Sequence, residues 1–156
     1  MNVTFEALPS DVVREIRQTG RDSYGAPVER HVSDGSAYPC RHCLGATPKG
    51  ETYLILAHRP FSSAHPYAET GPIFLCEADC ARAAPSGEVP PILEAPDYIV
   101  RGYSAEERIV YGTGGVVPTP RIAARAAEIL ADPAIAFVDV RSARNNCFQC
   151  RVRRAS

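Results

Sequence analysis

The stretch AFVDVRSARNNCFQCRV, residues 136–152, predicts a β-hairpin. Apolar and polar residues alternate on both sides of segment 142–146, which is rich in turn-forming serine and asparagine. With Arg141 opposite Cys147, one face becomes continuously apolar and contains Ala136, Val138, Val140, Phe148, Cys150 and Val152. The other face would carry Asp139, Arg141, Cys147, Gln149 and Arg151. We therefore expect an antiparallel sheet with one dry and one wet side.

Outward from this hairpin, the sequence predicts two short helices and further strands. One helix should start at Pro9-Ser10, with Ser10 as its N-cap, and end before Gly20. The other should run from Thr119 and Pro120 to Asp132-Pro133. Strands are expected at 2–8, 28–32, 51–58, 72–76, 98–103 and 108–111. The fold class is thus α+β, mainly antiparallel with two short helices, in a single layer-packed domain over residues 1–156.

Composition and charge narrow the class of protein. Of the 156 residues, 17 are Lys or Arg and 18 are Asp or Glu, a balance that argues against nucleic acid as a partner. The longest aliphatic run, near residues 53–57, is far short of the roughly 18–20 residues that span a bilayer, so no membrane partner is expected. The N-terminus has no secretion-signal pattern. We therefore expect a cytoplasmic protein whose six cysteines are thiols or metal ligands.

The most specific local motif is Cys40-Arg41-His42-Cys43, with Gly45 two residues further on. Two thiolates at this spacing, followed by glycine, can form a knuckle that holds half of a zinc site. The candidate metal ligands are therefore Cys40 and Cys43, together with a second pair that has the same spacing, Cys147 and Cys150. On a regular strand, however, Cys147 and Cys150 would point to opposite faces.

The remaining cysteines allow two further roles. Cys76 and Cys80 could complete the zinc site instead, and His42 could serve as a ligand. Alternatively, Cys76 and Cys150 could be small buried hydrophobic residues, as free cysteines commonly are.

Two patterns suggest an enzyme. Cys147 would lie beside Arg141 in the hairpin, and a nearby cation lowers the pKa of a thiol toward that of a nucleophile, although no histidine is close in sequence. The loop after residue 58 carries His65 and Glu69, which could exchange protons, and Arg59, which could clamp a carboxylate or phosphate. The alternative is a solvated turn in which Arg59 and Glu69 form an internal ion pair.

Several motifs together resemble a known family. They are Tyr38-Pro39-Cys40-Arg41-His42-Cys43-Leu44, Arg59-Pro60-Phe61, Pro66-Tyr67-Ala68-Glu69-Thr70-Gly71-Pro72-Ile73-Phe74 and Asn146-Cys147-Phe148-Gln149-Cys150-Arg151-Val152. They are similar to the bacterial domain of unknown function family 1203 (DUF1203). The resemblance extends over nearly the whole chain and implies a complete single-domain protein, but it implies no reaction, cofactor or catalytic residue.

From these observations we expect a binding or accessory module that recognises a small anionic ligand or a protein partner. Its ligand-binding residues would be Arg59, Tyr67, Glu69, Thr70, Arg101 and Arg141. One alternative is a small enzyme that uses Cys147 or the His65–Glu69 pair. Another is an interaction domain stabilised by zinc.

Overall fold

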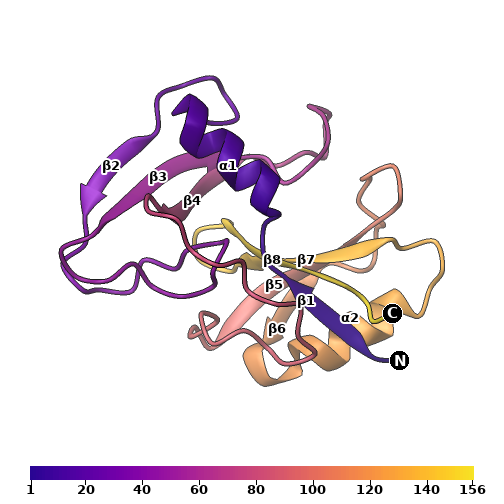
Figure 1. Cartoon of the computed structure of the whole chain (residues 1–156). Helices are drawn as coiled ribbons and strands as arrows, with labels where there is room; N and C mark the ends of the chain where they lie inside the picture. The colour runs from indigo at the N-terminus through magenta and orange to yellow at the C-terminus, as the bar shows by residue number, and fades with distance from the viewer.

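The computed structural model describes all 156 residues and contains two antiparallel sheets (Figure 1). The first sheet has the strand order β1-β8-β7-β5-β6, with β1 at Val3–Glu6, β5 at Asp97–Tyr103, β6 at Gly115–Pro118, β7 at Phe137–Ser142 and β8 at Phe148–Arg154. The second has the order β2-β3-β4, with β2 at Glu29–Val32, β3 at Thr52–His58 and β4 at Gly71–Cys76. The helices are α1 at Ser10–Thr19 and α2 at Ile122–Leu130. The expected α+β class is confirmed.

The first sheet and α2 form what we call the five-stranded lobe. One face of α2 packs on this sheet through Ile122, Ala126, Ile129 and Leu130. The sheet contributes apolar side chains from alternate strand positions, among them Val100, Val138, Val140, Cys150 and Val152. The helix approaches so closely that a Cβ on Gly102 would lie 2.9 Å from Ile129 Cγ2. Glycine at this position therefore permits the packing of α2.

The register of the final hairpin differs from the prediction. Asp139 pairs with Arg151 and Val140 with Cys150, whereas Arg141 pairs with Phe148. The reason is a shorter turn, in which Ser142 N donates to Cys147 O at 2.9 Å, followed by a bulge that adds Gln149 to β8. Val138, Val140, Cys150 and Val152 still share the apolar face, as expected, but Phe148 turns to the opposite face. That opposite face was expected to be exposed to water, and it is instead buried at Asp139, Arg141 and Gln149.

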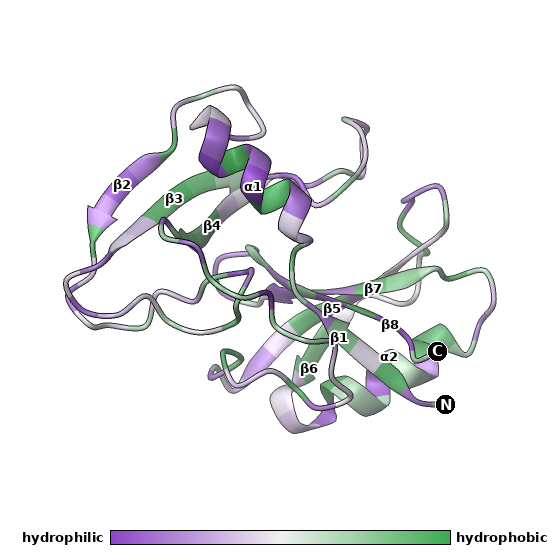
Figure 2. Cartoon of the chain, in the orientation of Figure 1, coloured by the Kyte–Doolittle hydropathy of each residue, from purple (hydrophilic) through white to green (hydrophobic).

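The second sheet and α1 form the three-stranded lobe, which is inserted in the chain between β1 and β5 (Figure 1). Val13 and Ile16 of α1 pack against Leu54 of β3 and against Ile73 and Leu75 of β4. The outer strand β2 is exposed at all four positions, and Figure 2 shows it as mostly hydrophilic. The core cluster with α1 lies on one side of this small sheet, and the other side carries the aromatic rings of Tyr38, Tyr53 and Phe74.

Phe148 of β8 and Arg41 join the two lobes. The Phe148 ring is buried in the core of the three-stranded lobe, although its backbone belongs to the five-stranded sheet. Arg41 Nε, from the loop before β3, donates to Phe148 O at 2.7 Å. The two cores are thus connected at the bulge of β8.

The expected strand at 108–111 is absent. Ile109 forms only an isolated bridge with Tyr103, and the chain then turns at Gly112, where φ is 89°. The outer partner of β5 is instead β6 at Gly115–Pro118. Neither helix of the fold has both the length and the apolar character needed to cross a bilayer.

Candidate functional site

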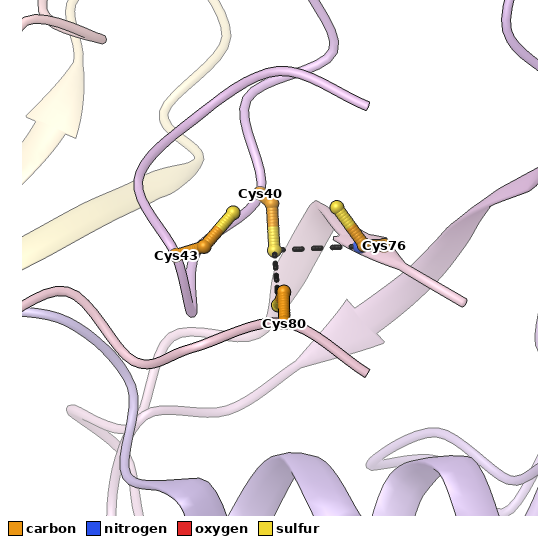
Figure 3. A group of neighbouring side chains, drawn as sticks. All are labelled: Cys40, Cys43, Cys76 and Cys80. Atoms are coloured by element: carbon orange, nitrogen blue, oxygen red, sulfur yellow. Dashed lines mark hydrogen bonds between the residues drawn. The ribbon is translucent and has the colours of Figure 1, made fainter. Parts of the chain in front are cut away.

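Four cysteine side chains converge in the three-stranded lobe (Figure 3). The sulfur atoms of Cys40, Cys43, Cys76 and Cys80 all lie within 4.8 Å of one another. In a tetrahedral zinc site with Zn–S bonds near 2.3 Å, the sulfurs are about 3.8 Å apart. These four thiols, which we call the cysteine cluster, therefore have a spacing that a single metal ion could adopt with small movements.

Local backbone structure places each member of the cluster. Cys40 and Cys43 lie in a tight turn closed by bonds from Cys40 N to Gly45 O and from Leu44 N to Cys40 O, at 2.8 and 2.9 Å. Leu44 has a positive φ of 54°, so the turn can bend back sharply. Cys76 is the last residue of β4, and Cys80 follows in the next loop. A bridge between Cys40 and Phe74 holds the turn beside β4, and this pairing brings the two halves of the cluster together.

Cys40 is the centre of the cluster. Its sulfur accepts a hydrogen bond from Cys76 N at 3.3 Å and lies 4.0 Å from Cys80 Sγ (Figure 3). Hydrogen bonds from the thiols of Cys43 and Cys76 lower the pKa of Cys40, and their contact with Cys40 raises the pKa of both partners. Cys40 is therefore the thiol whose deprotonation the neighbouring thiols favour. A dication would favour further deprotonation, because thiolates are the form that binds metal.

A ring of polar groups surrounds Cys80. His42 Nδ1 lies 3.2 Å from Cys80 Sγ, and its Nε2 lies 2.9 Å from Ser10 Oγ. Arg17 donates to the same sulfur at 3.3 Å and to Cys76 O at 2.9 Å. Burial lowers the pKa of His42. Helix α1 is thereby tied to the cluster, and Ser10, which we expected to cap this helix, makes no capping bond and uses its hydroxyl here instead.

Cys147 and Cys150 lie outside the cluster, so the structure completes the Cys40–Cys43 pair with Cys76 and Cys80 rather than with them. Cys150 is fully buried in the five-stranded lobe, and this burial raises the pKa of its thiol. Cys147 Sγ is contacted by Arg41 Nη2 at 3.7 Å and Gln149 Nε2 at 3.3 Å. The cation beside Cys147 is thus Arg41 rather than the expected Arg141, because of the shifted register, and its sulfur has no histidine within hydrogen-bond distance.

A second group of expected site residues meets between the sheets. Glu69 forms an ion pair with Arg101, accepts a hydrogen bond from the Tyr103 hydroxyl at 3.1 Å and lies 3.3 Å from Arg141 Nε. Burial raises the pKa of Tyr103 to about 12, so this hydroxyl stays protonated and is the donor of the hydrogen bond to Glu69. Three of the six expected ligand-binding residues are therefore together and pair largely with one another, although Arg141 Nη1 is buried without a hydrogen-bond partner. The alternative ion pair between Arg59 and Glu69 does not form.

The remaining loop residues are apart from this group. The Tyr67 hydroxyl bonds that of Tyr111 at 2.9 Å, and Thr70 bonds the carbonyl of Ala68 at 3.5 Å. The carboxylate near His65 is that of Glu107 rather than that of Glu69, with His65 Nε2 lying 3.6 Å from Glu107 Oε2. The expected exchange of protons between His65 and Glu69 therefore has no direct contact in this structure.

Sequence reasoning missed the buried pair Asp139–Arg151. Asp139 is 0% exposed and receives two bonds from Arg151, at 2.7 and 2.9 Å. The same guanidinium lies 3.7 Å from the centre of the Phe137 ring and donates to Pro60 O at 2.6 Å. Burial raises the pKa of Asp139, and the charge of Arg151 opposes this shift. The sequence signal that could have found this pair is the presence of opposite charges on neighbouring strands. The predicted register, however, did not place Asp139 opposite Arg151.

A comparison with protein families finds one match, to residues 37–154 of the 156-residue chain. The chain belongs to the DUF1203 family, described as proteins of unknown function. The DUF1203 match contains all six cysteines and every expected ligand-binding residue. No curated protein and no solved structure matched the chain.

Proposed function

We propose that this DUF1203 protein is a zinc-stabilised binding module in which Cys40, Cys43, Cys76 and Cys80 hold one zinc ion. The supporting observation is the convergence of four sulfur atoms within 4.8 Å from two separate segments of the chain. An all-cysteine tetrahedral set is typical of structural zinc, because it leaves no position for water or substrate. Thiolate ligands also favour zinc over the hard cations magnesium and calcium.

A metal here would join parts of the lobe that are far apart in the sequence. It would fasten the turn 40–45 to the end of β4 and to the loop after it. The bonds from His42 and Arg17 would then orient Cys80 and attach α1, as outer partners of metal ligands commonly do. We infer that residues 1–156 form one domain, since Phe148 places a side chain of one lobe in the core of the other.

The enzyme alternatives have weaker support. Cys147 has no histidine within hydrogen-bond distance to act as its base, and His65 lies against Glu107 instead of Glu69. A binding module requires only that a surface be held in place, which a structural metal can do.

The test is metal analysis of protein purified without a metal-binding tag. We expect one zinc per chain, lost in Cys80→Ser and kept in Cys147→Ser. These two cysteines are matched, because both are partly exposed and both accept a bond from arginine. Less than half an equivalent of zinc in the wild type, or equal loss in both variants, would overturn the proposal.

A further inference from the structure

We propose that the cleft between the two lobes binds the oxyanion of a small carboxylate or phosphate compound, with Arg59 as the principal contact. The cleft has a volume of 470 Å³ and is lined by both lobes, including Pro9 and Val12 near the start of α1 and Arg151 and Arg153 of β8. This inference names the ligand class of the binding module and so rests on that part of the proposed function.

Arg59 is the residue that indicates an anionic ligand. Its backbone is held by a bond from Arg59 N to Ser23 Oγ at 2.9 Å, directly after β3. Its guanidinium, in contrast, takes part in no ion pair and no hydrogen bond, and its Nε is buried without a partner. Buried donors are normally satisfied, and a guanidinium fits the two oxygens of a carboxylate or phosphate.

The carboxylates that could have satisfied Arg59 are committed elsewhere. Glu69 is held by Arg101, Tyr103 and Arg141. Within the cleft, Glu107 accepts bonds from Ser62 N and Oγ at 2.9 Å each. Glu6 pairs with Arg153 at 3.3 Å, and Glu15 is exposed on α1. Among the arginines that line the cleft, Arg59 therefore has the one guanidinium without a partner.

The walls of the cleft suit an anion with a small apolar body. Its lining contains four arginines, Arg59, Arg82, Arg151 and Arg153, against three glutamates. Burial, and then the positive charges of Arg151 and Arg59, lower the pKa of His58 to about 4, so this wall holds two guanidinium groups near a neutral histidine. Phe61 and Phe148 add ring surface to the same cleft. An oxyanion that contacts Arg59 could thus rest its apolar part on these rings.

The experiment titrates the zinc-loaded protein with three probes while the Nε–H resonances of arginine are followed by NMR. The probes are benzoate, inorganic phosphate and, as a neutral match to benzoate, benzamide. We expect saturable shifts of the Arg59 resonance with benzoate or phosphate and none with benzamide. Tighter binding of benzoate would identify a carboxylate ligand, and tighter binding of phosphate would identify a phosphate ligand.

Arg59→Gln should weaken binding of the preferred anion at least tenfold, and Arg59→Lys should weaken it less. The control is Arg14→Gln on α1, which removes the same charge from an exposed side chain without an ion pair and should leave the affinity within twofold. No saturable binding of either anion, or equal loss in both glutamine variants, would overturn this inference. If one zinc per chain is still present in that protein, the metal proposal stands while the anion site fails.

Discussion

The two lobes of this DUF1203 protein use different means to hold a sheet together. The five-stranded lobe covers its sheet with α2 and buries an uninterrupted apolar face, from Val138 and Val140 to Val152. The three-stranded lobe has a smaller core, and its outer strand β2 is exposed throughout. In addition, this lobe has four thiols close together near the end of β4. The contrast is that one lobe is stabilised by a larger apolar core, whereas the other would add a metal ion to a smaller core if the proposed zinc binds.

The cysteines illustrate the same difference. Cys150 is surrounded by apolar side chains of the five-stranded lobe, and burial raises the pKa of its thiol. Cys40 is just as buried, but the thiols of Cys43 and Cys76 donate to it and lower its pKa. Cys150 therefore behaves as a small hydrophobic residue, whereas Cys40 has the surroundings of a metal ligand.

The largest effect should come from Cys40→Ser, which removes the central member of the cluster. We expect loss of zinc and a fall in the free energy of unfolding of more than about 4 kcal/mol, because a structural metal is lost. Hydrogen exchange should accelerate first in β3 and β4, while β7 keeps most of its protection. Chemical denaturation with an exchange readout measures both quantities. Equal acceleration in β4 and β7 would show that the two lobes are stabilised in the same way.

An intermediate effect should come from acid, through His58 at the end of β3. Its pKa is about 4 in the fold, below the ordinary value of 6.5, because of burial and then the charges of Arg151 and Arg59. The unfolded chain therefore binds the proton first, and the stability that is fully present above pH 6.5 is lost progressively as the pH falls toward 4. The loss should be about 2–3 kcal/mol.

Substitution of His58 by glutamine should remove this part of the pH dependence, as measured by denaturant unfolding at several pH values. His31→Gln, which removes a histidine from the exposed strand β2, is the control. If His58→Gln has the same slope as the wild type between pH 6.5 and 4, the depressed pKa of His58 is contradicted.

The smallest effect is expected from alanine substitution of two valines, one in each lobe. Val138 of β7 is 0% exposed, and Val138→Ala should cost roughly 2–3 kcal/mol of unfolding free energy through lost burial and a cavity. Val32 of β2 is 68% exposed, and Val32→Ala should change stability by less than about 0.5 kcal/mol. Thermal and urea denaturation of both variants measure this difference. Similar costs would mean that β2 has a buried face in solution.

Local patterns predicted much of the fold. The limits of α1 followed from Pro9 and Gly20, and the apolar side of β7 and β8 followed from alternation along each strand. The prediction of a strand at 108–111 was wrong because the chain turns at Gly112, and the strand that pairs with β5 follows this turn. The predicted orientation of Phe148 was wrong because the bulge in β8 turns its side chain to the other face of the sheet. A bulge of this kind is hard to recognise from the alternation of polar and apolar residues.

By itself, the sequence determined the half of the site that is local: Cys40 and Cys43 are three residues apart, so their turn is set by nearby backbone bonds. Only the tertiary structure decided that Cys76 and Cys80 complete the cluster, since this depends on the turn lying beside β4. It also decided that Arg59 has no carboxylate partner, because Arg101 and Arg141 reach Glu69 from other strands. Competition among distant side chains for one carboxylate is settled by packing, and the spacing of residues along the chain carries no record of it.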